Sequence, residues 1–199
     1  MKKTITLILA FLLLCFGLSA CTDLKDNNDD NDGGNENSSP TTAANILVAY
    51  FSCTGNTENI AKMIARETGG ALHEIQPQIP YTEADLDYYS GGRADREQAD
   101  PAARPAIANS VENMPDYDVI FLGYPIWHVQ APKIIYTFLE SYDFSGKTVI
   151  PFATSGGSGL GETANGLRAS CAVKFAPGKM LNGVLTNEVL QQWLNGLLL

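Results

Sequence analysis

The chain has 199 residues, with 13 Lys or Arg and 22 Asp or Glu, so its formal net charge is −9. This balance argues against nucleic acid as a partner, because phosphate backbones are bound mainly through Lys and Arg, and against a surface that adheres to anionic lipid. The four cysteines and two histidines do not have the spacing of metal ligands or of a disulfide framework. We therefore expect no metal site, and we interpret Cys53 and Cys171 as separate thiols, with pairing between them as the alternative.

Residues 1–20 have the features of a secretion signal. Two lysines precede a run of about 14 apolar residues from Ile5 to Leu18, which is shorter than a membrane-spanning helix of about 20 residues. The run ends in Leu-Ser-Ala-Cys at residues 18–21, which resembles the bacterial lipobox. That resemblance implies cleavage before Cys21, acyl chains on this cysteine, and a place in the bacterial cell envelope facing the periplasm or the cell exterior. The alternative is an ordinary cleaved signal with a chance cysteine.

Residues 21–44 are rich in Asp, Asn, Gly, Ser and Thr and contain almost nothing that can be buried. Such a composition is typical of disorder, so we predict an acidic tether over this range. The remaining residues, 45–199, are enough for one domain with a sizeable core.

Within 45–199, short apolar runs alternate with amphipathic patterns. Strands are predicted at residues 46–51, 71–76, 119–123, 148–153 and 180–184. Helices are predicted after the first strand, ending at Gly69-Gly70, and at residues 133–142, 161–171 and 187–199. Prolines and charges interrupt residues 79–116, where only short helical pieces around 83–89 and 104–111 are expected. The alternation predicts an α/β domain with a parallel sheet covered on both faces, whose ligand lies at the carboxyl ends of the strands.

The first of these strand ends carries uncharged donors before a helix. Such a loop suits a phosphate, since a glycine allows close approach and the helix N-terminus offers free N–H groups. No Gly-Lys-Ser/Thr sequence follows, so the loop is not that of the nucleoside-triphosphatases. The alternative is a helix cap made by Thr54 or Asn56. The residues predicted to hold phosphate are Ser52, Thr54, Gly55, Asn56 and Thr57.

Here the sequence resembles the flavodoxin family, whose first loop reads Ser or Thr, any residue, Thr or Ser, Gly, Asn or Thr, and Thr. The resemblance covers nearly all of residues 45–199. It implies a doubly wound, five-stranded parallel sheet of order 2-1-3-4-5 with helices on both faces. It also implies that the first loop binds the phosphate of flavin mononucleotide (FMN).

The second loop, after the strand at 119–123, reads Gly-Tyr-Pro-Ile-Trp-His. A flavin ring needs an aromatic or apolar platform, which Trp127 is placed to supply; ordinary core packing of Trp127 is the alternative. Similar family members carry a comparable Pro-Ile-Trp loop against the ring, so Pro125 and Ile126 are included. We interpret His128 as an exposed spectator, with donation to a substrate as the alternative.

The third loop, after the strand at 148–153, is small, polar and rich in glycine. Its backbone amides are suited to the edge of a flavin, and the residues concerned are Thr154, Ser155, Gly156, Gly157, Ser158 and Gly159. Flavodoxins often have an aromatic residue in this loop, which is missing here. The second face of the ring is therefore either open to a substrate or covered by Tyr88 or Tyr89.

These observations favour an FMN-binding, flavodoxin-like electron carrier anchored by Cys21, which exchanges electrons with a partner protein or a small-molecule acceptor. Two alternatives stay open: an FMN-dependent NAD(P)H or quinone oxidoreductase, and a flavin-free binding lipoprotein. No residue is assigned a catalytic role.

Overall fold

The computed structural model describes residues 44–87, 89–161, 163–170, 173–183 and 185–197, all in the second of two compact units, which spans Thr42–Leu199. The predicted signal, Cys21 and the tether up to residue 43 lie outside the described residues, as do Tyr88 and Cys171. Within the described ranges, no helix is both long enough and apolar enough to cross a membrane.

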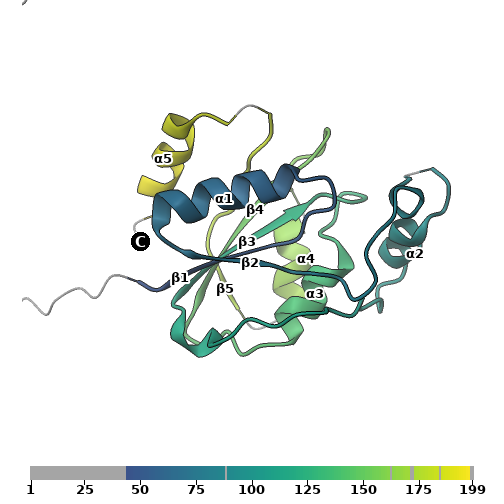
Figure 1. The fold of residues 1–199 in the computed structure, drawn as a ribbon, viewed down its shortest axis with the longest axis horizontal. Coiled ribbons are helices and arrows are strands. Elements are labelled where there is room, and N and C mark those ends of the chain that lie inside the picture. The colour runs from purple at the N-terminus through teal and green to yellow at the C-terminus, as the bar shows by residue number, and fades with distance from the viewer. Residues whose placement is uncertain (1–43, 88, 162, 171–172, 184, 198–199) are drawn as a thin grey trace, which may run out of the picture. The chain divides into compact units, whose positions relative to one another are not determined.

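A parallel sheet forms the centre of the domain (Figure 1). Its strands run in the order β2-β1-β3-β4-β5, with β6 also paired to β4, and this confirms the predicted order. The strands are β1 (Ile46–Tyr50), β2 (Ala71–Glu74), β3 (Val119–Pro125), β4 (Thr148–Thr154), β5 (Lys174–Phe175) and β6 (Lys179–Met180).

The edge strand differs from the prediction of a single strand at residues 180–184. It is divided into β5, which pairs with Thr148 and Val149, and β6, which pairs with Phe152 and Ala153. The interruption lies opposite Pro151, which has no N–H to contribute to a ladder. A Cβ at Gly178 would meet the carbonyl oxygen of Pro151 at 2.6 Å, so only glycine fits this close approach.

Two layers of helices cover the sheet, as expected. Helices α1 (Asn56–Thr68) and α5 (Asn187–Asn195) lie on one face, and α3 (Lys133–Glu140) and α4 (Thr163–Ser170) lie on the other (Figure 1). Side chains of the central strands alternate between the two faces: Leu47 and Ala49 belong to the core under α3, whereas Val48 and Tyr50 belong to the core under α1. This alternation fixes the register that brings the ends of β1, β3 and β4 to one edge of the sheet.

Residues 75–118, which connect β2 to β3, are called the crossover segment here. They contain the short 3-10 helices η1 (Ala84–Leu86) and η2 (Met114–Asp116), and the helix α2 (Arg93–Ala99). Figure 1 shows α2 beyond the carboxyl ends of the strands rather than on a face of the sheet.

The helix expected at 104–111 is not formed, and α2 was not predicted. Residues 106–108 instead run antiparallel to the chain that leaves β2, with N–H groups of Gln78 and Ala108 donating across at 2.8 Å each. Pairing with this distant stretch satisfies the backbone groups that a helix would satisfy locally. The expected helical piece at 83–89 is reduced to the single turn of η1.

Candidate functional site

The three predicted loops meet at the carboxyl ends of β1, β3 and β4, where they line a cavity of about 460 Å³. This volume lies in the range of small-molecule sites, about 300–1,000 Å³. Eight of the predicted residues line it: Thr54, Asn56, Pro125, Ile126, Trp127, Thr154, Ser155 and Gly156. The cavity is also lined by Asn59, Ile60, Leu181, Asn182 and Gly183, which were not predicted.

The first loop turns sharply at Gly55, whose φ of 82° belongs to the left-handed region that favours glycine. No side chain caps α1 at this point, so the alternative of a cap by Thr54 or Asn56 is not observed. The amide of Asn56 donates instead to Thr54 Oγ1 at 3.1 Å. The first N–H groups of an α-helix have no partner within the helix, and here no side chain caps them where α1 begins beside the cavity.

Thr57 and Thr154 join the first loop to the third. Their hydroxyl oxygens are 2.8 Å apart, and both side chains are buried. The Thr57 hydroxyl, predicted to hold phosphate, is thus engaged with the end of β4. The pair fixes the start of α1 against the sheet and so sets the distance between the two loops.

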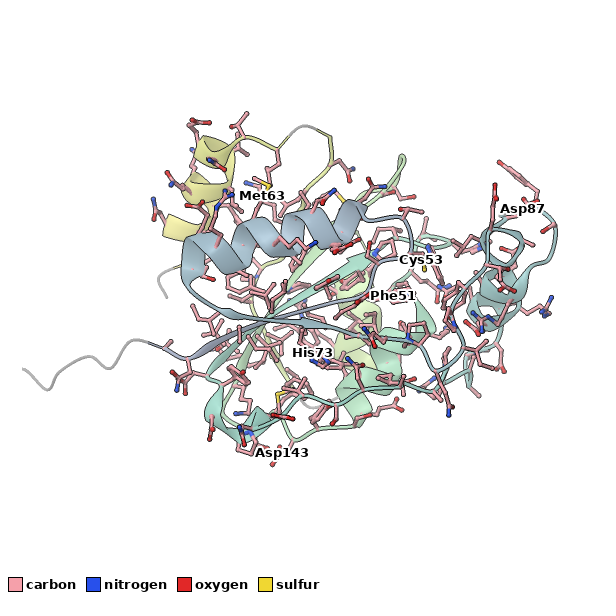
Figure 2. The ribbon with its side chains drawn as sticks, in the orientation of Figure 1. Phe51, Cys53, Met63, His73, Asp87 and Asp143 are labelled. Carbon is pink, nitrogen blue, oxygen red and sulfur yellow. The ribbon has the colours of Figure 1, made fainter. Side chains whose placement is uncertain are left out.

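The second loop begins where β3 ends. The N–H of Ile126 donates to the Thr154 carbonyl at 2.8 Å, which holds this loop beside the third. Trp127 is half-buried and packs edge-on against Phe51 and Tyr81, with ring centroids 5.4 and 5.2 Å away. Trp127 therefore both belongs to an aromatic cluster and lines the cavity, so the platform and packing interpretations are compatible. Figure 2 shows Phe51 at the end of β1.

The third loop is shaped by Ser155. Its hydroxyl accepts from the N–H groups of Gly157 and Ser158 at 3.1 and 2.8 Å, and its own N–H donates to Asn182 Oδ1 at 2.7 Å. Gly157, Ser158 and Gly159 do not line the cavity, and neither do Ser52, Gly55 and Thr57.

Asn182 is the main functional candidate that the sequence interpretation missed. It follows β6, lines the cavity and holds the third loop. The Asn-Gly pair at 182–183 is a turn signal, but the predicted strand at 180–184 included it. Asn59 and Ile60 could also have been predicted, because they lie three and four residues after Asn56 and so share its helix face.

His128 is not exposed, contrary to what was expected of it. Its side chain is half-buried, and Nε2 lies 2.7 Å from Asp95 Oδ1 on α2. Tyr89, one of two residues expected to cover a flavin, is 93% exposed; the other, Tyr88, lies outside the described residues.

Cys53 lies within the first loop, between Ser52 and Thr54, and its side chain is exposed (Figure 2). Desolvation by the surrounding protein, opposed in part by Arg93, raises its pKa to about 12. The thiol is therefore protonated at neutral pH, which argues against a nucleophilic role. Among the described residues, no cluster of His, Cys, Asp and Glu is suited to a metal ion.

Comparison with known proteins identifies the family. A model of the flavodoxin family matches residues 45–197. The chain belongs to the flavodoxin family. Flavodoxin 1 of Salmonella typhimurium is 27% identical over 109 residues, which make up 53% of this chain and 46% of that protein, and flavodoxin 1 of Escherichia coli K12 gives the same values. The chain thus spans about half the length of the curated relatives it matches.

Solved structures of flavoproteins agree with this assignment. Candidate flavoproteins from Bacteroides eggerthii and Bacteroides uniformis are 43% and 42% identical, with TM-scores of 0.75 and 0.74. The matches cover 78% and 77% of this flavodoxin-family chain and 99% of each of theirs. A flavoprotein in complex with FMN from Lactobacillus acidophilus is 20% identical with a TM-score of 0.61, covering 76% of this chain and 99% of its own, which is a likeness of fold.

Proposed function

We propose that this flavodoxin-family protein binds FMN in the 460 Å³ cavity and transfers electrons with it, while Cys21 anchors the chain to a membrane. Family membership supports FMN as the cofactor, as does the FMN complex of the Lactobacillus acidophilus flavoprotein. The observation that carries the proposal is the meeting of an uncapped helix N-terminus, a tryptophan and a glycine-rich loop around one cavity.

The donors present fit the parts of FMN. A phosphate is suited to the free N–H groups at the start of α1 and to the polar side chains of Thr54, Asn56 and Asn59. The apolar wall formed by Ile126 and Trp127 suits a flat ring system. When bound, FMN supplies the one- and two-electron chemistry, and the protein supplies binding, orientation and its electrostatic field.

Reconstitution with FMN tests the binding. The purified flavodoxin-family chain should become yellow, and FMN should quench the emission of Trp127, which lines the cavity. Trp193, on α5, is the matched control because it lies away from the cavity, packed edge-on against Phe121 at 5.8 Å. Trp193→Phe should leave most of the quenching, whereas Trp127→Phe should remove most of it. A colourless, unquenched wild-type chain would instead favour a flavin-free binding protein.

The chemistry of the third loop favours one further candidate, an FMN-dependent NAD(P)H or quinone oxidoreductase. This loop has no aromatic side chain, and Gly156, Gly157 and Gly159 are exposed. Steady-state oxidation of NADH or NADPH with a quinone acceptor separates the two functions. A carrier shows almost no turnover without a reductase partner, whereas an oxidoreductase turns over alone.

Anchoring is tested separately from flavin binding. We expect Cys21→Ser to release the protein from the membrane fraction, because one acyl chain or none holds a protein only weakly. Cys53→Ser is the control, since this thiol belongs to the folded domain. Continued flotation of Cys21→Ser with membranes would contradict the anchor.

A further inference from the structure

The second loop contains a two-residue turn in a conformation that is costly for its residues. Trp127 and Gln130 exchange both backbone hydrogen bonds at 2.9 Å, and His128 and Val129 lie between them with φ of 48° and 58°. Such turns usually carry Asn or Gly, and a β-branched residue with positive φ is an outlier. Strain of this kind persists only when surrounding contacts hold it.

Those contacts come from α2 in the crossover segment. The side chain of Gln98 is only 5% exposed, and its amide donates to the carbonyls of Trp127 and Ala131 at 3.1 and 3.2 Å. Its oxygen accepts from the N–H of Lys133 at 3.0 Å, at the start of α3, where Pro132 offers no side-chain cap. One buried amide thus fixes both ends of the loop between β3 and α3.

Asp95 adds a second contact from the same face of α2, since it precedes Gln98 by three residues. Its carboxylate lies 2.7 Å from His128 Nε2, within the strained turn itself. The other carboxylate oxygen accepts from the N–H of Gly91 at 3.1 Å. The turn and the preceding tryptophan are therefore held from a segment that takes no part in the sheet.

We propose that α2 is a clamp that sets the position of Trp127 for the flavin, with Gln98 and Asp95 as its positioning residues. The inference rests on the proposed FMN binding. Neither residue lines the cavity, so both act through the loop and not on the cofactor.

Gln98→Met removes the amide and keeps the side-chain length. Asn109→Leu is the matched control: its amide also bridges two backbone groups, donating to Glu74 O at the end of β2 at 2.7 Å and accepting from Gln76 N of the crossover segment at 3.1 Å, away from the cavity. We expect Gln98→Met to raise the Kd for FMN at least tenfold. We expect Asn109→Leu to change it less than twofold at a comparable loss of thermal stability. Equal changes in Kd for the two variants would overturn the clamp.

A Trp193→Phe background tests the clamp without FMN, because Trp127 is then the only tryptophan. Gln98→Met should shift the emission of Trp127 in the cofactor-free chain, and an unchanged spectrum would overturn the clamp. If the unmodified chain takes up no FMN, the proposed function fails, while the emission of Trp127 still reports on the clamp.

A double-mutant cycle tests the role of Asp95. Val129→Gly relieves the strain at the β-branched residue of the turn, so Asp95→Ala should raise the Kd for FMN several-fold in the wild-type background and less than twofold beside Val129→Gly. The contact of Asp95 with Gly91 is common to both backgrounds and cancels in the cycle. An equal effect of Asp95→Ala in both backgrounds would show that Asp95 does not act through the turn.

Discussion

The sheet and the crossover segment hold the same cavity by different means. The central strands are held by ladder hydrogen bonds and by fully buried side chains on both faces, such as Ile120 on one face and Phe121 on the other. The two ends of the crossover segment contribute Ile75, Val111 and Met114 to the core, whereas its middle reaches the loop beside the cavity through single side chains such as Gln98. Changes in the sheet should therefore unfold the domain, whereas changes at polar contacts in the middle of the crossover segment should alter the loop it holds at smaller cost in stability.

The largest expected effect lies within the sheet, at Gly123. A Cβ on this residue would lie 2.2 Å from the ring of Phe152, which is fully buried and cannot move away. We expect Gly123→Ala to lower the free energy of unfolding by about 3 kcal/mol, at the upper end of the usual cost of overpacking. Urea unfolding measures it, and Phe152→Leu in the same chain should restore part of the loss. A cost below about 1 kcal/mol would contradict the rigid packing.

The buried pair of Thr57 and Thr154 should give the next largest effect. Thr57→Val leaves the Thr154 hydroxyl buried without its partner, which costs about 2 kcal/mol. Replacing both residues by Val removes both hydroxyls and should cost less than either single change. Urea unfolding of the two single variants and the double variant, without FMN, provides the comparison. Additive losses would show that the hydroxyls do not depend on each other.

The same contrast explains what the sequence could predict. The central strands and the three loops followed from local patterns, because each buried strand carries its own apolar run and each loop follows directly from one. The strand order came from the resemblance to the flavodoxin family. The prediction of a single edge strand was wrong because Pro151, on a neighbouring strand, interrupts the pairing. Helix α2 was not predicted because its sequence, Arg-Ala-Asp-Arg-Glu-Gln-Ala, has no apolar periodicity. The helix is fixed instead by contacts with residues about 30 positions later. Asn182 was not predicted as a site residue because the predicted strand at 180–184 included it.

In the crossover segment, Tyr81→Phe should lower the free energy of unfolding by less than Gly123→Ala or Thr57→Val does. The Tyr81 hydroxyl donates to the carboxylate of Glu97, and burial together with this bond raises its pKa. The ring also lies under the guanidinium of Arg93, 3.9 Å from its centroid, and this contact stays in the variant. We expect a loss of about 1 kcal/mol in urea unfolding, the net value of one hydrogen bond. A loss as large as that of Gly123→Ala would mean that the crossover segment is as tightly coupled to the core as the sheet.

The smallest effect should come from the ion pair between Arg104 of the crossover segment and Glu140 at the end of α3. Both nitrogen–oxygen contacts are 2.8 Å, and both side chains are about one-third exposed. The hydrogen bonds from Arg104 lower the pKa of Glu140 below its ordinary value of 4.5. A carboxyl whose pKa is lowered in the folded state stabilises the protein above the pKa of the unfolded chain, and loses this contribution as the pH falls through the folded value.

Comparing the free energies of unfolding of the wild type and of Glu140→Gln isolates the contribution of this ion pair. Because solvent screens the pair, we expect a difference in unfolding free energy of about 0.5 kcal/mol at neutral pH. The difference should shrink towards zero below the folded pKa of Glu140, and 1 M salt at neutral pH should reduce it in the same direction. A difference that is independent of pH would assign the contribution of Glu140 to packing on α3 rather than to charge. The crossover segment would then be held at this point as the sheet is, by contact area.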